Sequence, residues 1–298
     1  MTPMQEPVSP AGFDSPPRRP AAPVRLQALL YLLTTLTTFA AGAVGWQPVL
    51  LGFDVGIAEQ VAVHWPRGLA YMAAVMAVLT AHEAGHFIAA RLHGIGATLP
   101  FFIPVPVLLT GTMGAVIGME GSRASRRQLF DIALAGPVAG LVVTLPLLAF
   151  GMLGGSAAES NPFAMPPLAR WLLAALRPDL PAGSTIAPNA LFMGGWVGLL
   201  VTGLNMVPVS QLDGGHIGTA VFGRRGNWLA RGTLLAAIAA IVLFGKLNWV
   251  VMVVVVTLIG VDHPPIRDDG RPLGVWRTAL GVLSFLIPLV TFMPEPLA

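Results

Sequence analysis

Apolar residues follow one another in long runs along this chain, and short polar segments separate the runs. Seven runs reach or approach the length of a membrane-spanning helix, at residues 26–44, 68–92, 129–153, 191–206, 228–244, 247–261 and 277–293. A helix needs about 20 predominantly apolar residues to cross the hydrocarbon core of a bilayer. Because the fifth and sixth runs are short, the pattern predicts an all-α polytopic membrane protein with six or seven transmembrane helices.

One further apolar stretch, residues 98–119, does not have the pattern of a helix. Proline and glycine interrupt it at Pro100, Pro104, Pro106, Gly111, Gly114 and Gly118. Proline removes a helical hydrogen bond, and glycine favours turns and irregular backbone. We expect a short β-hairpin that dips into the membrane with one strand edge exposed. The alternative is a re-entrant loop that only packs against the helices.

The composition agrees with membrane insertion. Of the 298 residues, 55% are hydrophobic and 10% are charged, and the mean hydropathy is +0.74. The net charge of +3 does not indicate nucleic acid binding, because short cytoplasmic loops of membrane proteins collect basic residues. The chain has no cysteine, so a metal ion must be held by His, Asp or Glu.

Charge also predicts the orientation in the membrane. If the N-terminus is cytoplasmic, all but four of the 17 Lys and Arg residues fall on the cytoplasmic side, as the positive-inside rule requires. Residues 1–23 are rich in proline and poor in large apolar groups, which predicts a disordered cytoplasmic tail. The excess of Arg, Ala, Gly and Pro suggests a bacterial protein, and we expect it in the inner membrane.

The second apolar run contains the sequence "AHEAGHFIAARL", residues 81–92. Residues four apart share a helix face, so His82 and His86 present two imidazoles to one metal ion, with Glu83 beside them. Two histidines and a carboxylate base are the arrangement of metalloproteases, and zinc is the natural metal. The alternative is a transporter that uses the same residues as a proton or metal relay.

A catalytic zinc ion typically has three protein ligands, so a third must come from another part of the chain. Most acids fall in predicted loops, which leaves Asp131 and Asp213. Pro208 should break the fourth helix, and the glycines after Asp213 permit irregular backbone. His82 lies about 21 Å along its helix, near the cytoplasmic face, and the break falls at the same level. The shared depth therefore favours Asp213 over Asp131 as the third metal ligand.

Two motifs together resemble the site-2 protease family of intramembrane zinc metalloproteases. They are "HEAGH" and, more than a hundred residues later, "LNMVPVSQLDGG". Supporting matches are "PFFIPVPVLLTGTMGAVIGM" and "DIALAGPVAG", and the resemblance covers about residues 68–265. The long gap at 154–188 is too short for a PDZ domain, so the chain is similar to compact members of the family without one.

The resemblance implies roles for five residues. His82, His86 and Asp213 would bind one zinc ion, and Glu83 would be the general base. Asn205 matches the family's asparagine, which would orient substrate or stabilise the oxyanion; the alternative is an amide that packs helices together. The second motif argues against a prenyl-protein-processing protease. The presence of His82, Glu83, His86 and Asp213 together argues against a non-catalytic scaffold.

The function implied is hydrolysis of a peptide bond in or near the transmembrane segment of a single-span membrane protein. The hairpin edge would receive the unwound peptide by strand addition. A cut near the cytoplasmic side would release a cytoplasmic fragment, often after a first cut by another protease. We expect a membrane-embedded metalloprotease domain over 24–298, with a catalytic core of about 68–227 and the lipid bilayer as its surroundings.

The remaining ionisable residues carry weaker signals. His216 either lines the cavity or has a structural role, and Asp131 is a candidate to orient a ligand histidine. The segment 262–270 predicts a solvated turn with charges of both signs. Three histidines fall in loops or near the interface and show no cluster: His64, His93 and His263.

Overall fold

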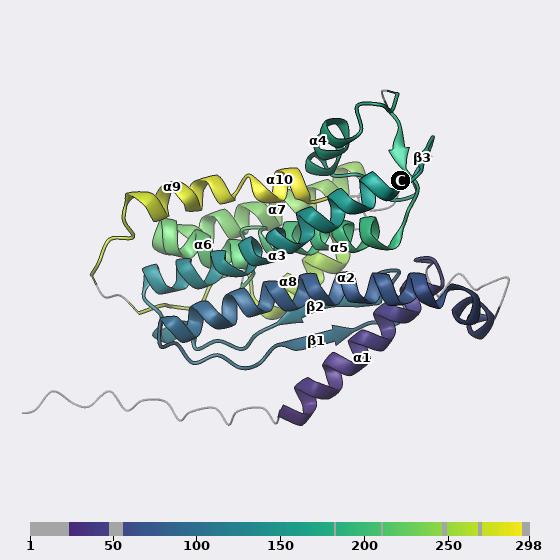
Figure 1. Ribbon diagram of the computed structural model, residues 1–298. Helices are drawn as coiled ribbons and strands as arrows, with labels where there is room; N and C mark the ends of the chain where they lie inside the picture. Colours follow the sequence, from purple (N-terminus) through teal and green to yellow (C-terminus); the bar gives the residue numbers. More distant parts are fainter. Residues whose placement is uncertain are drawn as a thin grey trace, which may run out of the picture.

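The computed structural model describes residues 24–47, 56–181, 183–209, 211–245, 249–267 and 270–293. Most of these residues are helical, and the long helices lie side by side along the molecule (Figure 1). The tail expected over residues 1–23 lies outside the described residues.

The helices follow the apolar runs of the sequence. Their bounds are α1 Val24–Ala43, α2 Ile57–Leu92, α3 Arg126–Gly154, α4 Pro167–Leu176, α5 Ala190–Asn205, α6 Asp213–Phe222, α7 Gly226–Phe244, α8 Trp249–Ile259, α9 Val275–Ser284 and α10 Ile287–Thr291. Short 3-10 turns precede α3 and α7, at η2 Gly121–Arg123 and η3 Gly223–Arg225. The strands are β1 Phe101–Pro104, β2 Thr112–Val116, β3 Ala157–Ala158 and β4 Thr185–Ile186.

Four helical segments are long and apolar enough to cross a membrane. They are Val24–Ala43, Ile57–Leu92, Arg126–Gly154 and Asp213–Phe244, the last of which contains α6, η3 and α7. The run at 191–206 forms α5, which has 16 residues. The described residues therefore form a helical membrane protein, and the count of six or seven spans remains a prediction.

Two runs differ from the expected single straight helix. α2 begins at Ile57 rather than at residue 68, and it kinks at His64, whose φ is −112°. Pro66 lies inside the helix, and a proline there lacks the N–H for one helical hydrogen bond. The last run is divided into α9 and α10, with Pro288 in the first turn of α10.

Residues 98–119 form the expected hairpin. β1 and β2 pair antiparallel, with Phe102 opposite Ala115 and Pro104 opposite Thr112. The register shifts between these two pairs, where proline has no N–H to donate. In the described structure β2 pairs only with β1, so the second edge of β2 has no strand partner.

Helix α1 braces the hairpin from one side. Tyr31 packs edge-on against Phe102, with ring centroids 4.9 Å apart, and the Gln27 side chain donates to the Leu99 carbonyl oxygen at 2.9 Å. Gly111, with φ +75°, lies so close to the backbone of α1 that a Cβ atom would collide with it. The hairpin therefore has a fixed position against α1.

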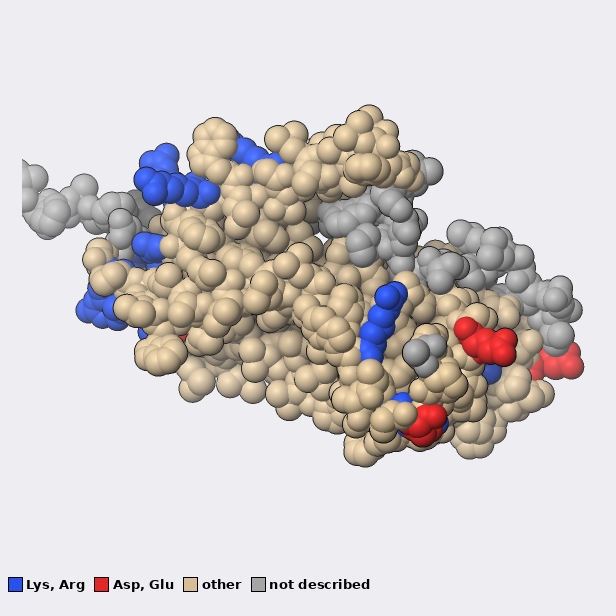
Figure 2. Space-filling view, turned by 90° about the horizontal axis from the view of Figure 1, so that it is seen from above, with Lys and Arg blue, Asp and Glu red and all other residues tan. Residues whose placement is uncertain are grey.

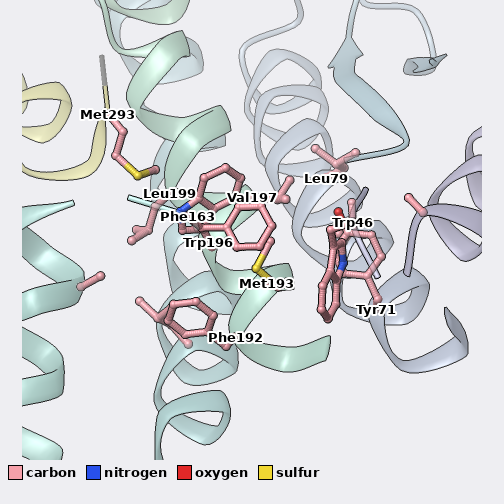
Figure 3. Close-up of a cluster of buried hydrophobic side chains, with 14 of the residues drawn as sticks. Trp46, Tyr71, Leu79, Phe163, Phe192, Met193, Trp196, Val197, Leu199 and Met293 are labelled. Atoms are coloured by element: carbon pink, nitrogen blue, oxygen red, sulfur yellow. The ribbon is translucent and has the colours of Figure 1, made fainter. Parts of the chain in front are cut away.

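The main apolar core joins α2, α3, α5 and the segment around α4 (Figure 3). Trp196 of α5 is 1% exposed and meets Phe163 edge-on at 5.4 Å. Its indole N–H donates to the Ala164 carbonyl oxygen at 2.8 Å. Burial of a large aromatic side chain with its polar atom satisfied stabilises this end of the molecule.

We predict that Trp196→Ala lowers the free energy of unfolding by about 3–5 kcal/mol, because it leaves a cavity and an unpaired carbonyl. Thermal unfolding in detergent measures the change. Trp171→Ala is the control, since Trp171 on α4 is 61% exposed, and it should change stability little. Equal losses for the two variants would contradict the assignment of Trp196 to the core.

Candidate metal centre

His82 and His86 lie four residues apart on α2 and point to the same side. Their Nε2 atoms are 3.1 Å apart, and the residues are only 1% and 6% exposed. The Asp213 carboxylate completes a triangle, with Oδ2 3.2 Å from His82 Nε2 and Oδ1 3.2 Å from His86 Nε2. Residues more than a hundred positions apart thus meet at one point.

A break between α5 and α6 brings Asp213 to this position. α5 ends at Asn205 and α6 begins at Asp213, because Pro208 cannot continue a helix. Gly214 lies against the backbone carbonyls of Met206 and Val207, where a Cβ atom would collide with both. The glycine after Asp213 is therefore required for the close turn that presents the carboxylate.

The three side chains fit one zinc ion. Two imidazoles and a carboxylate are a donor set that zinc prefers, and ligands about 2.0–2.1 Å from a tetrahedral zinc lie about 3.3 Å from one another. The observed separations are 3.1 and 3.2 Å. Asp213 Oδ2 is buried with no hydrogen-bond partner in the described structure, which a cation would satisfy.

Backbone contacts orient one of the ligand rings. His86 Nδ1 lies 2.8 Å from the Ile132 carbonyl oxygen, so Nδ1 carries the hydrogen and Nε2 has its lone pair free for a metal. His82 Nδ1 has no hydrogen-bond partner among the described residues. Packing against Gly140 holds the His82 ring instead, since a Cβ at that glycine would lie 3.1 Å from Nδ1.

Small residues on α3 make room for the ligand histidines. A Cβ atom at Gly136 would overlap the His86 ring at Nε2. Beside it, Gly85 of α2 lies against the backbone of Ala135. Small residues let two helices approach closely, and here the space gained holds the imidazoles.

Glu83 and Asn205 lie at the same site. Glu83 is 3% exposed and lines a cavity of about 120 Å³ together with His82, His86 and Asp213. Asn205 also lines this cavity, and its Nδ2 is 3.3 Å from His82 Nε2. All five residues singled out in the sequence therefore surround one cavity, whose lining also includes Ala115 to Ile117 from β2 and the residue after it.

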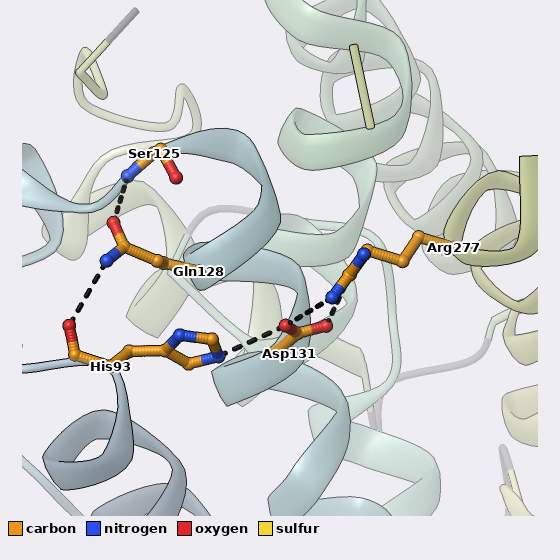
Figure 4. Close-up of polar contacts among 5 residues, drawn as sticks. All are labelled: His93, Ser125, Gln128, Asp131 and Arg277. Carbon is orange, nitrogen blue, oxygen red and sulfur yellow. Dashed lines mark hydrogen bonds and ion pairs between the residues drawn. The ribbon is translucent and has the colours of Figure 1, made fainter. Parts of the chain in front are cut away.

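Asp131 does not orient a ligand histidine, in contrast to the role considered for it. Its carboxylate binds Arg277 of α9 through Nε at 2.8 Å and Nη2 at 3.0 Å, and it lies 3.1 Å from His93 Nε2 (Figure 4). Gln128 joins the cluster by donating to the His93 carbonyl oxygen at 3.1 Å. The cluster ties α9 and the end of α2 to α3.

Two histidines that showed no cluster in the sequence do have partners. His93 contacts Asp131, and His263 Nε2 lies 2.6 Å from His216 Nδ1. The described part of the segment, 262–267, is not a simple solvated turn, because His263 is 9% exposed and Asp262 pairs with Arg231 of α7. No local spacing signals these contacts, since the partners are 31 or more residues apart.

We predict that Gly136→Ala weakens zinc binding roughly 10- to 100-fold, as changes beside a ligand often do, because the new methyl group displaces His86. Metal titration of purified protein measures the affinity. Gly154→Ala on the same helix is the matched control, since a Cβ there meets nothing within 4 Å. Unchanged affinity in the Gly136 variant would show that the α2–α3 contact does not position the ligand.

We also predict that Asp131→Asn lowers the free energy of unfolding by about 1–2 kcal/mol, because a partly exposed charge-assisted pair is lost. Thermal or denaturant unfolding measures it. Asp179→Asn is the control: its side chain is 60% exposed, and its ion pair with Arg177 should contribute little to stability. If both variants lose the same stability, the cluster on α3 has no special role.

Comparison with known proteins agrees with this geometry. The family model of peptidase family M50 matches residues 70–245. The probable zinc metalloprotease EGY2 of Arabidopsis thaliana, a chloroplastic protein, is 29% identical over 228 residues, which are 74% of this chain and 41% of the relative. The probable zinc metalloprotease EGY1 of Oryza sativa subsp. japonica is 29% identical over 234 residues, which are 74% of this chain and 39% of the relative.

The chain thus spans about two fifths of the length of these relatives. No solved structure gives a significant match. No PDZ domain is present among the described residues, where the segment between α3 and α5 holds only α4 and two short strands. The matched region contains His82, Glu83, His86, Asn205 and Asp213, and the chain belongs to peptidase family M50.

Proposed function

We propose that this protein is a zinc endopeptidase that hydrolyses a peptide bond in or near the transmembrane segment of another membrane protein. One observation carries the proposal: a buried His82, His86 and Asp213 triangle shares its cavity with Glu83, on helices long and apolar enough to cross a membrane. Family membership and the metalloprotease relatives support zinc and proteolysis.

The side chains of the cavity have complementary roles in this reaction. Zinc, when bound by His82, His86 and Asp213, would act as a Lewis acid that polarises the scissile carbonyl. Glu83 is the general base: it would take a proton from the attacking water and return it to the leaving amine. The Asn205 amide is placed to donate a hydrogen bond to the oxygen that gains negative charge.

The hairpin is the proposed substrate platform. β2 contributes Ala115 and Val116 to the cavity lining, and one of its edges has no strand partner in the described structure. A helical substrate must unwind before water reaches its peptide bonds, and an extended segment can then add to the free edge. The substrate would therefore lie as a strand between β2 and the metal ligands.

Charge supports an orientation with the N-terminus in the cytoplasm. On the face shown in Figure 2, most of the Lys and Arg side chains lie toward one end of the molecule. Exposed arginines lie in the turns η2 and η3, next to the starts of α3 and α7. By the positive-inside rule this end faces the cytoplasm, in our proposal that of a bacterial cell with the protein in its inner membrane.

The proposed partners are a single-span substrate and the surrounding bilayer, with a first-cut protease acting before this one. A transporter is not favoured, because the His and Asp groups gather at one level instead of marking a path across several spans. The relatives, which are probable metalloproteases, also favour hydrolysis.

We predict that Glu83→Gln keeps one zinc per chain but lowers the cleavage rate of a single-span substrate about 100- to 10,000-fold, because the general base is lost. Asp213→Ala should lose zinc and activity together. Elemental analysis and a gel-based cleavage assay measure both properties. Glu59→Gln, an exposed position on the same helix α2, is the matched control and should behave as wild type. Full activity of the Asp213 variant would exclude Asp213 as a ligand.

A further inference from the structure

His216 is a partly buried ionisable group that the reaction above leaves without a role. It lies in α6, three residues after Asp213, and lines the same cavity as Glu83. Its Nδ1 is 2.6 Å from Nε2 of His263, and the two rings meet edge-on with centroids 4.8 Å apart. Two histidines in direct contact beside a metal site need an explanation.

The contacts of His263 fix the direction of this hydrogen bond. His263 Nδ1 lies 2.6 Å from the Pro264 carbonyl oxygen, which can only accept, so Nδ1 carries a hydrogen. Burial lowers the pKa of His263, and the ring is therefore neutral with a lone pair on Nε2. That lone pair accepts the hydrogen from His216 Nδ1. Asn227 holds the backbone of His263 by accepting from its N–H at 3.3 Å.

His216 consequently has its hydrogen on Nδ1 and a lone pair on Nε2. His263 is not part of the cavity lining, so the His216 Nδ1 that contacts it is turned away from the cavity. The other ring nitrogen of His216, Nε2, is the one that can face the cavity. No described residue donates a hydrogen bond to Nε2. His216 is also not a further metal ligand, because the group of donor atoms within 4.8 Å contains only His82, His86 and Asp213 among the described residues.

A peptide bound along β2 would need such an acceptor. Backbone N–H groups of an extended segment point alternately to its two edges. One edge pairs with β2, while the N–H groups of the other edge are removed from water and require partners from the rest of the cavity. Residues 211–213 and His216 line this cavity together with β2, and His216 is the residue among them with a lone pair on a ring nitrogen to offer.

We propose that His216 Nε2 accepts a hydrogen bond from a backbone N–H of the extended substrate, and that His263 and the Pro264 carbonyl lock His216 in the tautomer that can do so. The proposal rests on the proposed function, since it concerns the peptide that this site would cleave. It makes His216 a substrate-binding residue, distinct from the metal ligands and from the general base Glu83.

Two substitutions separate the two ring nitrogens. His216→Asn keeps an amide at the position of Nδ1, where it can still donate to His263, but has no atom at the position of Nε2. His216→Gln places its amide at the position of Nε2 and gives up the contact with His263. Both should bind one zinc, because neither removes a ligand. His216→Asn should also unfold at nearly the wild-type temperature, because it keeps the contact with His263.

We predict that His216→Asn lowers kcat/KM on a single-span substrate about 10-fold, the loss of one hydrogen bond of about 1.4 kcal/mol, mainly through a higher KM. His216→Gln should recover a large part of this loss. A purely structural histidine would instead show its effect in unfolding temperature or zinc content, and the glutamine would not rescue it.

Ester substitution in the substrate identifies the hydrogen bond itself. In a series of substrates, one backbone N–H at a time, outside the scissile bond, is replaced by an ester oxygen. At one position the ester should lower kcat/KM of the wild type about 10-fold relative to the amide substrate. At the same position the ester should cause no further loss in His216→Asn. The inference would be overturned if the losses caused by the ester and by His216→Asn were additive at every position. It would also be overturned if His216→Asn showed wild-type kinetics or lost its zinc. Failure of the wild type to cut any substrate would overturn the proposed function, and the inference with it.

Discussion

The close contact between α2 and α3 is the constraint on which the metal centre depends. A Cβ atom at Gly136 would overlap the His86 ring, and Gly140 packs against His82. The same helix supplies the Ile132 carbonyl that orients His86. A larger side chain at either glycine would separate the helices or displace a ligand, so the site exists because α3 presents small residues along α2.

Asp213, which follows the irregular segment between α5 and α6, and the β-hairpin both approach this helix pair. Backbone that is neither helix nor sheet is tolerated at membrane depth only where protein or a water-filled cavity surrounds it. The break between α5 and α6 satisfies this condition because it ends against α2, where the carboxylate meets two imidazoles. The hairpin is held by α1 on one side, and β2 borders the cavity on the other. The cavity is thus a meeting point of elements that are far apart in the sequence.

The sequence predicts the parts of this arrangement that depend on local pattern. Helical spacing places His82 and His86 on one face, prolines and glycines mark the hairpin, and Pro208 marks the break before Asp213. Contacts between distant segments could not be predicted in the same way. Arg277 and Asp131 are 146 residues apart and His216 and His263 are 47 apart, and neither pair has a periodicity that connects it. The division of the last run into α9 and α10 coincides with Pro288, which has no N–H for a helical bond to the Ser284 carbonyl, a local signal that the apolar pattern alone does not contain.

The most direct test of the central claim is to map the bond that is cut. The zinc-loaded protein is incorporated in lipid vesicles with a single-span substrate, and mass spectrometry identifies the new termini. We expect one main cut inside the apolar segment of the substrate, toward the membrane face near which the arginines of η2 and η3 lie. Cuts confined to the water-exposed loops of the substrate, or an uncut substrate beside protein that holds its zinc, would contradict it.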